Sequence, residues 1–459
     1  MKKPQTTQYF RIGFLFLLIV SLLIISMSTS PIQADTLTVD AVNYESDQIV
    51  IKLLPTTSIE TITSNYMVSP VRQLLNNDIY LLQAASAADA NQIVSAMSND
   101  PTIEYAELNL IASAPEASGR DIYGWPDGDS ETNLQKESDP QLLFEFEWEM
   151  SGSESAHYYQ QPTVAQVKVD QSLSQGNGVV VAVIDTGMDL NHPLLRNNIA
   201  PNKYDFIDND VTPQDEFNNL DDDGDGFIDE VAGHGTHVAG IIHLVAPAAQ
   251  IMPLRVLDSD GQGNSFIVAE AMLYALENGA DIINLSLGTT YQSQFLLDVV
   301  AQVTDAGVVV VAAAGNFGED TPQYPAAADC ALAVTAIGPG HVKAEYANYG
   351  PWVDLVVPGK RIYSTYPNDA FAWWNGTSMS APFVAGQAAL IVSHSPSLTL
   401  EEIGDLIAGT AVSLDNANPD YAGQLGAGLI DIKDSLTTLA NGDWPNTSLN
   451  PLAGCAQEN

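Results

Sequence analysis

Several segments of the chain carry residues that together could perform nucleophilic catalysis. Ser378 lies in the segment 376–382, Gly-Thr-Ser-Met-Ser-Ala-Pro, at the start of an expected helix. Small neighbours leave its hydroxyl uncovered, and the helix dipole favours negative charge at this end. A serine hydroxyl is a poor nucleophile unless a base removes its proton. The chemistry therefore requires a histidine, a carboxylate that orients it, and donors for an oxyanion.

Asp185 and His234 are the candidates for the carboxylate and the base. Asp185 directly follows the apolar run 179–184, at the end of an expected buried strand, although an acid that only caps a turn would look the same. His234 opens the segment His-Gly-Thr-His-Val-Ala-Gly, whose small residues let a helix pack close to a sheet. His237, one turn further on, is expected to be a core residue. The alternative of a metal held by both histidines lacks the glutamate base of the motif His-Glu-x-x-His.

Asn316 is the candidate for the oxyanion donor. It comes after the apolar run 308–314 and Gly315, at the end of another expected strand. A side-chain amide held there can donate a hydrogen bond to a developing negative charge. An asparagine after a glycine is also a common turn pair, so this residue indicates catalysis only together with the other candidates.

The elements that must position these residues alternate between short apolar runs and helical segments. Runs buried on both faces are typical of parallel strands, with helices covering both faces of the sheet. The sequence therefore predicts an α/β catalytic domain over residues 162–438, with three layers and a mainly parallel sheet between helices. Working residues collect at the carboxyl ends of such strands, where Asp185 and Asn316 lie. The expected strands are 179–184, 251–256, 282–287, 308–313, 331–337 and 353–357, and the expected helices are 265–278, 294–305, 379–393 and 400–408.

The rest of the chain divides by composition. Residues 1–34 have a basic start and an apolar run shorter than the roughly 20 residues that span a bilayer, so a secretory signal peptide is favoured over an uncleaved anchor. Residues 35–115 are expected to form a small α+β unit. Residues 116–161 form an acidic linker, exposed and cleavable. Residues 439–459 are expected to be a poorly ordered tail. In the small unit the expected strands are 48–54, 78–82 and 102–111, and the expected helix is 87–97.

The composition limits the partners. The chain has 57 acidic and 15 basic residues, a formal charge of -42, whereas binding to nucleic acid needs a cationic face. The charge fits solubility in an extracellular medium or bound calcium. Cys330 and Cys455, the only cysteines, could form one disulfide after export or remain two thiols. We expect a secreted monomer that is not bound to a membrane once the signal is removed.

The segments Val-Ile-Asp-Thr-Gly, His-Gly-Thr-His-Val-Ala-Gly, Ala-Ala-Gly-Asn and Gly-Thr-Ser-Met-Ser-Ala-Pro, in this order, resemble the subtilisin family of serine proteases over about residues 162–437. The resemblance implies that Asp185 orients His234 and that His234 takes the proton of Ser378. Ser378 would attack a peptide carbonyl of a protein or peptide substrate, and Asn316 and the backbone N–H of Ser378 would hold the oxyanion. The unit 35–115 resembles the family's propeptide, which assists folding and inhibits the active site until it is removed.

The same resemblance indicates where substrate binds. One strand edge would pair with an extended peptide by β-augmentation, and a facing wall would complete the specificity pocket. Gln323 stands where many members of the family carry glycine at the pocket floor, so the depth of the pocket is an open question. The substrate-binding residues would be Ser286, Leu287 and Gly288 on the edge, and Ala312, Ala313 and Gly315 on the wall.

An acidic loop lies between the aspartate and histidine motifs. Acids at alternate positions followed by Gly226 can bend a loop around one cation, as in the first nine positions of an EF-hand loop. The usual glutamate at position twelve is replaced by Ala232, although Glu230 is near. We expect a structural Ca²⁺, and the alternative is a solvated acidic loop. The ligands would be the carboxylates of Asp221, Asp223, Asp225 and Asp229 and the carbonyl of Phe227.

Two other functions compete with a secreted endopeptidase made as a self-processing zymogen. One is a catalytically silent relative that serves as a binding protein, which the presence of every catalytic residue type argues against. The other is a dinucleotide-binding protein, suggested by Gly176 and Gly178. These glycines precede the strand instead of following it, so they do not fit a phosphate-binding turn.

Overall fold

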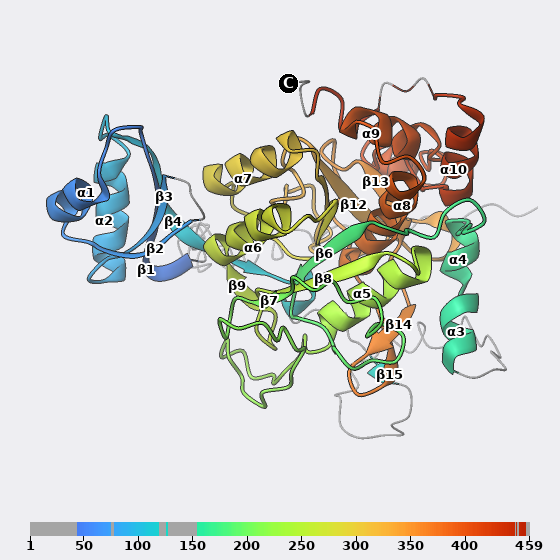
Figure 1. Cartoon of the computed structure of the whole chain (residues 1–459), viewed down its shortest axis with the longest axis horizontal. Coiled ribbons are helices and arrows are strands. Elements are labelled where there is room, and N and C mark those ends of the chain that lie inside the picture. The colour runs from blue at the N-terminus through green and yellow to red at the C-terminus, as the bar shows by residue number, and fades with distance from the viewer. Residues whose placement is uncertain are drawn as a thin grey trace, which may run out of the picture. The chain divides into compact units, whose positions relative to one another are not determined.

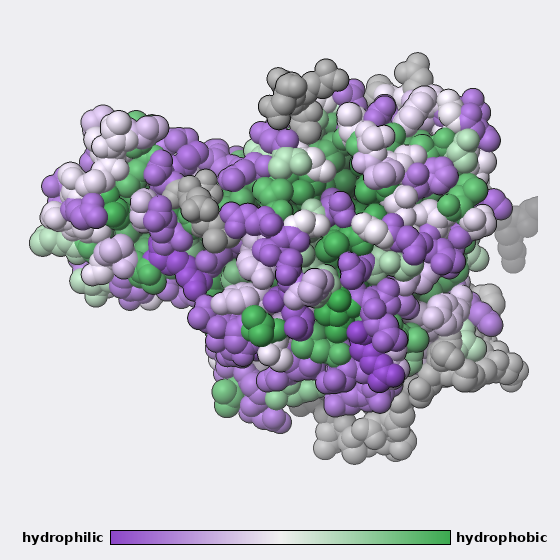
Figure 2. Space-filling view, viewed as in Figure 1, coloured by the Kyte–Doolittle hydropathy of each residue, from purple (hydrophilic) through white to green (hydrophobic). Residues whose placement is uncertain are grey.

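The computed structural model describes residues 44–74, 78–118, 125–126, 154–445, 447 and 449–455. The expected signal peptide, residues 1–34, and most of the expected linker, residues 116–161, lie outside the described residues. In the part of the chain that is described, no helix is long and apolar enough to cross a bilayer. The face shown in Figure 2 is largely hydrophilic, with small hydrophobic areas between polar ones.

A seven-stranded parallel sheet forms the centre of the larger part of the molecule (Figure 1). Its strands are β6 (Val180–Asp185), β7 (Tyr204–Asp205), β8 (Gln250–Arg255), β10 (Ile282–Leu285), β11 (Val309–Ala313), β12 (Ala331–Ile337) and β13 (Leu355–Pro358). They lie in the order β13-β12-β11-β10-β6-β8-β7. In β6, Val181 and Val183 belong to one core cluster and Ala182 and Ile184 to another, because alternate side chains point to opposite faces.

Helices cover both faces of this sheet (Figure 1). The helices α6 (Ser265–Glu277) and α7 (Gln294–Asp305) pack in the cluster that contains Ala182 and Ile184. The helices α5 (His234–Val245) and α8 (Ala381–His394) pack in the other cluster, and α9 (Leu400–Gly409) and α10 (Ile432–Asn441) pack against α8. The predicted α/β fold with three layers is confirmed.

A small α+β unit precedes this fold, as predicted. Its elements are β1 (Tyr44–Leu53), α1 (Ile59–Tyr66), β2 (Ser69–Gln73), β3 (Ile79–Gln83), α2 (Ala87–Met97) and β4 (Ile103–Ser113). Ile49 and Ile51 face the two helices and form a separate core with Ile62 and Met97. Val50, on the opposite face of β1, belongs to the cluster that contains α6 and α7. The short strand β9 (Gln262–Asn264) extends this sheet by pairing with β4.

A hairpin, a short strand that pairs with it and two short helices complete the larger fold. The strands β14 (Ile362–Tyr366) and β15 (Ala370–Trp374) form an antiparallel hairpin, and β5 (Trp125–Pro126) pairs with β15. Two short helices, α3 (Glu154–Gln160) and α4 (Pro162–Gln166), lead into the large sheet. Tyr158 of α3 is fully buried and its hydroxyl donates to the carbonyl of Gly240 in α5.

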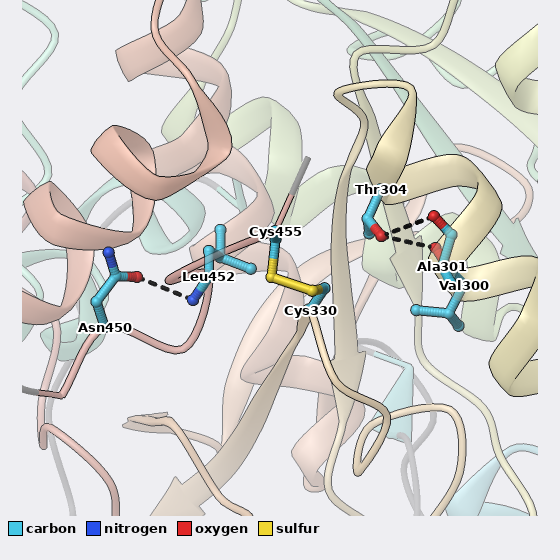
Figure 3. Close-up of a disulfide and its surroundings, with 7 residues drawn as sticks. All are labelled: Val300, Ala301, Thr304, Cys330, Asn450, Leu452 and Cys455. Atoms are coloured by element: carbon cyan, nitrogen blue, oxygen red, sulfur yellow. Dashed lines mark hydrogen bonds between the residues drawn. A yellow bond between two sulfur atoms is a disulfide. The ribbon is translucent and has the colours of Figure 1, made fainter. Parts of the chain in front are cut away.

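The tail is tied to the fold where it was expected to be poorly ordered. Cys330 and Cys455 form a disulfide, so the open choice between a bridge and two thiols is decided for the bridge (Figure 3). The side chain of Asn450 donates to the carbonyl of Glu401, and its Oδ1 accepts from the N–H of Leu452, which is fully buried. The tail lacks a periodic apolar pattern, so its attachment was not predicted from the sequence.

Replacing both cysteines, Cys330→Ser with Cys455→Ser, should lower the unfolding free energy by about 2–5 kcal/mol. The bridge joins residues 125 positions apart, so without it the unfolded chain regains the entropy of a long loop. Thermal unfolding with and without reductant measures the effect: reductant should lower the melting temperature of the parent but not of the double variant. Equal melting temperatures of the two proteins under oxidising conditions would contradict the prediction.

Candidate active site

The first candidate side chains meet at the carboxyl edge of the parallel sheet. Asp185 is the last residue of β6, and His234 is the first residue of α5. Nδ1 of His234 lies 2.7 Å from Oδ1 of Asp185, and both side chains are fully buried. A methyl group on Gly235 would lie 2.1 Å from the carbonyl oxygen of Gly187 and 3.1 Å from Cβ of Asp185. Glycine at 235 therefore allows the helix to approach the strand closely enough for this contact.

Ser378 and Asn316 lie beside this pair. Ser378 is in the short 3-10 turn Thr377–Met379 that leads into α8, and it is fully buried. The backbone N–H and the hydroxyl of Thr377 both donate to Oδ1 of Asn316, at 3.0 and 2.9 Å. This leaves Nδ2 of Asn316 as a donor beside the serine. The carbonyl of Ser286, which follows β10, lies 3.3 Å from Oγ of Ser378.

The carboxylate of Glu116 occupies the space between these groups. Oε2 of Glu116 accepts from Oγ of Ser378 at 2.7 Å, and Oε1 accepts from Nδ2 of Asn316 at 2.9 Å. Nε2 of His234 lies 3.2 Å from the same Oε2, an ion-pair distance without the alignment of a hydrogen bond. Among the described residues, Nε2 of His234 has no hydrogen-bond partner, so the serine hydroxyl points to Glu116 instead of to the base.

His234 lies between two carboxylates, which controls its pKa. Burial alone would lower the pKa, but the carboxylates of Asp185 and Glu116 outweigh burial and raise it to about 10. The imidazole is therefore protonated near neutral pH while Glu116 is in place. A protonated histidine cannot accept the proton of Ser378, so the arrangement is that of an inhibited site.

The second histidine of the motif has a structural role, as expected. Nε2 of His237 lies 3.1 Å from the carbonyl oxygens of Ile362 and of Ala372, and the ring is fully buried. Burial, together with the charge of His234, lowers the pKa of His237 to about 3, although the two carbonyl contacts act in the opposite direction. Nδ1 of His234 pairs with Asp185, whereas Nε2 of His237 contacts backbone carbonyl groups, which favours a packed core role for His237 over the metal pair considered from the sequence.

The end of strand β4 lies along the predicted peptide-binding edge. Ser113 exchanges two backbone hydrogen bonds with Gly288, of 2.9 and 3.0 Å, and the N–H of Ala114 donates to the carbonyl of Gly261. On its other side β4 pairs with β9. The chain before Glu116 is thus bound as an extended strand, in the manner expected of a substrate. Of the other predicted substrate-binding residues, Leu287, Ala312 and Ala313 are buried, and the N–H of Gly315 donates to Oγ1 of Thr377.

The small N-terminal unit also contacts the starts of two helices. Oδ1 of Asn109 accepts from the N–H of Phe266 and the hydroxyl of Ser265 at the start of α6. Glu107 accepts from the N–H of Gln294 and the hydroxyl of Ser293 at the start of α7. Helix starts carry free N–H groups and favour negative charge, so these contacts attach the unit firmly to the larger fold.

Asp215 is a positioning residue that the sequence analysis missed. Its buried carboxylate accepts from the N–H groups of Gly233 and Thr236 at 2.8 and 3.0 Å, and from the hydroxyl of Thr236 at 2.7 Å. The hydroxyl of Thr186 donates to it at 3.3 Å. It therefore joins the segment after Asp185 to the start of the helix that carries His234. Asp215 lies in an acidic stretch without a motif, so nothing in the sequence distinguished it from its neighbours.

The acidic loop brings only part of the predicted calcium ligands together. Asp221, Asp223 and Asp225 offer carboxylate oxygens that lie within 4.8 Å of one another. Asp229 is not in this cluster, and its carboxylate accepts from the backbone N–H groups of Asn218 and Asn219. Its place as a ligand stays a prediction. The N–H of Phe227 donates to Oδ1 of Asp225 at 2.8 Å, and the place of its carbonyl as a ligand stays a prediction.

Glu230 lies close to the same acidic residues. Both of its carboxylate oxygens are out of contact with solvent and have no hydrogen-bond partner among the described residues. Burial, followed by the charges of Asp225, Asp260, Asp223 and Asp221, raises the pKa of Glu230 to about 8. A bound cation would offset both the cost of burying the charged carboxylate and the repulsion between the acids. This donor set therefore fits a hard divalent ion such as Ca²⁺.

Comparison with known proteins gives consistent matches. Residues 176–428, more than half of the chain, match the model of the subtilase family, and residues 32–109 match that of the fervidolysin N-terminal prodomain. The chain is 39% identical to thermitase of Thermoactinomyces vulgaris over 264 residues, which cover 54% of this chain and 89% of thermitase. It is 34% identical to a thermophilic serine proteinase of Bacillus sp. strain AK1 over 333 residues, covering 69% of this chain and 71% of that protein.

A solved structure matches as well. It is the crystal structure of fervidolysin from Fervidobacterium pennivorans, a keratinolytic enzyme related to subtilisin, with a TM-score of 0.67 and 21% identity. The match covers 87% of this chain and 62% of the fervidolysin chain, so the present chain spans less than two thirds of that protein. At this identity the match shows the fold alone.

Neutralising Glu116 should destabilise the full chain in a pH-dependent way. The folded pKa of His234, about 10, is above its ordinary value of 6.5. The stabilisation that this pairing gives is therefore fully present below about pH 6.5 and is lost as the pH rises through about 10. In a Ser378→Ala background, Glu116→Gln should lower the melting temperature near pH 7, and the difference from the background should shrink toward pH 10.

Glu107→Gln is the matched control, because Glu107 lies on the same segment but contacts α7 instead of His234. Its effect on the melting temperature should stay nearly constant from about pH 7 to 10. A constant effect of Glu116→Gln over this range would contradict the assigned contact.

Proposed function

Since the chain belongs to the subtilase family and is a serine endopeptidase, we propose that it hydrolyses peptide bonds through an acyl-enzyme on Ser378. We further propose that it is secreted and is made as a zymogen that processes itself. The observation that carries the proposal is the convergence of Asp185, His234, Ser378 and Asn316 on one buried spot.

The proposed reaction begins when Glu116 leaves the site. The pKa of His234 then falls, and Nε2 becomes free to accept the proton of Ser378 while Asp185 holds Nδ1. Oγ of Ser378 attacks the peptide carbonyl, and His234 passes the proton to the leaving amine. The amine leaves, and His234 takes a proton from a water molecule that attacks the acyl-enzyme. His234 then returns this proton to Oγ of Ser378 as the ester bond breaks.

The proposed oxyanion site consists of Nδ2 of Asn316 and the backbone N–H of Ser378. Thr377 holds the amide of Asn316 in the required orientation through Oδ1. Pre-oriented donors of this kind stabilise the transition state without reorganising. Loss of such an amide costs about 3 kcal/mol of transition-state stabilisation, a value established on subtilisin.

We propose that Glu116 keeps the zymogen silent. Its carboxylate interacts with the nucleophile, the base and the oxyanion donor at once, and the side chain is only 2% exposed. Pro115 precedes it and has no N–H to donate to the carbonyl of Ser286 as an ordinary substrate residue would. The segment 113–116 thus has the features of a bound inhibitor, and we place self-processing in the acidic linker 116–161.

Export is supported by the character of residues 1–34 and by the disulfide between Cys330 and Cys455. Such bridges persist in oxidising environments and are rare in the cytosol of mesophiles. We propose that the mature enzyme acts outside the cell as a monomer on protein or peptide substrates, with the N-terminal unit as its own inhibitor.

Ser378→Ala should abolish hydrolysis and leave the full chain unprocessed in a protease-free host, because the same serine performs both reactions. Intact mass of the purified chain and hydrolysis of a denatured protein measure the two effects. Thr377→Ser, which keeps the hydroxyl that binds Asn316, serves as the control and should still be processed. Processing of Ser378→Ala at the normal rate would refute self-processing, and surviving hydrolysis would refute the nucleophile.

We propose a structural Ca²⁺ site formed by Asp221, Asp223, Asp225 and Glu230. The clustered carboxylates support it, as does the buried carboxylate of Glu230, which has no hydrogen-bond partner in the described part of the chain. The loop ends a few residues before His234, and Asp260 fixes it by accepting from the N–H groups of Asp222 and Asp229. An ion here would stabilise the loop and only indirectly affect catalysis.

Calcium should raise the melting temperature, and Asp223→Ala with Asp225→Ala should remove most of that rise. A ligand that binds only the folded state stabilises it by about 2.7 kcal/mol at a hundredfold excess over Kd. The double variant should keep activity in the cold, since no chemistry is assigned to these acids. Exposed Asp208, which pairs with Arg255, offers the control variant Asp208→Ala, whose calcium response should equal that of the parent. An unchanged response in the double variant would place the ion elsewhere.

A further inference from the structure

The space between the two walls of the predicted specificity pocket holds the side chain of Gln323. Gly288 is on the wall that pairs with Ser113, and Gly315 is on the wall that ends at Asn316. A methyl group on Gly288 would lie 2.8 Å from Cγ and from Nε2 of Gln323. A methyl group on Gly315 would lie 1.7 Å from its Oε1. One side chain therefore touches both walls at positions where neither wall has a side chain of its own.

The backbone holds Gln323 in this position. The next residue, Tyr324, exchanges two backbone hydrogen bonds of 2.8 Å with Thr289, which directly follows Gly288. The carbonyl of Gln323 itself accepts from the N–H of Ala327 at 2.8 Å. The main chain at 323 is thus tied to the substrate-binding wall, and only rotation of the side chain could clear the space.

A structural hydrogen bond does not explain why this amide is buried. Gln323 is 2% exposed, and its Oε1 has no hydrogen-bond partner among the described residues. A buried acceptor without a partner destabilises a fold instead of supporting it. The position of the side chain is better explained by what it excludes from the pocket.

Resting on the function proposed above, we propose that Gln323 is a specificity-determining residue that makes the pocket shallow, so that the enzyme cleaves after small residues such as alanine or serine. In a substrate, one residue would pair with Gly288 as Ser113 does. The residue two positions later would then lie beside Ser378, between the two walls. In the present chain that residue is Pro115, a compact side chain that is itself buried. Phenylalanine or leucine at that position would collide with the amide of Gln323.

The test is hydrolysis of chromogenic tetrapeptides that differ only in the residue before the scissile bond. The full chain is expressed, left to process itself, and assayed for kcat/KM with alanine, serine, leucine and phenylalanine at that position. The parent should prefer alanine and serine over phenylalanine at least tenfold. Gln323→Gly should raise kcat/KM for phenylalanine at least tenfold and change that for alanine little.

Gln323→Met is the matched control, because it keeps the length and volume of the side chain and removes the amide. It should reject phenylalanine as the parent does, and its melting temperature should not fall. A parent that prefers phenylalanine, or a Gln323→Gly variant with the parent's ratio, would overturn the inference.

Labelling of Ser378 by a serine-directed phosphonate separates this inference from the function on which it rests. A parent that is labelled and cleaves peptides, but whose preference is unaffected by Gln323→Gly, would overturn the role of Gln323 alone. A parent that is neither labelled nor active on any peptide would overturn the proposed function and this inference with it.

Discussion

The 2.7 Å contact between Asp185 and His234 is the interaction around which the rest of the molecule is arranged. It joins the end of strand β6, in the interior of the large sheet, to the first residue of α5, with both side chains fully buried. A buried charge of this kind is tolerated only where partners compensate for it. The parallel sheet supplies such a place, because its strand ends bring Ser286 and Asn316 to the same edge. Gly235 and Asp215 then fix the distance between strand and helix.

The burial of Asp185 and His234 also explains how the N-terminal unit can control the site. Once Asp185 and His234 are enclosed, the most favourable additional group is an anion that can pair with the imidazolium and accept from Ser378 and Asn316. Glu116 has this chemistry and is delivered by a strand that is paired on both sides. Both carboxylates raise the pKa of His234. In the proposed mechanism Asp185 orients the base for catalysis, whereas Glu116 keeps the base protonated and unable to act.

The sequence predicted the regular part of the fold well, because the apolar runs directly express burial. The helix expected at 294–305 has those bounds in α7, and the expected strand 331–337 is β12. The residues gathered at the site were also predictable, since each lies in a segment with unusual spacing of small residues. Glu116, Asp215 and the fixed tail were not predicted. Their roles come from contacts between residues far apart in the sequence, and neither periodicity nor local composition records such contacts.

We propose that Asp185 and Glu116 together keep His234 protonated in the full chain. NMR of isotope-labelled histidine in the unprocessed Ser378→Ala chain tests it most directly, with His234→Gln used to assign the resonance. The His234 ring should stay protonated until the pH approaches about 10, because two carboxylates lie beside it. Loss of the ring proton near the ordinary pKa of 6.5 in the intact chain would show that the two carboxylates do not hold it.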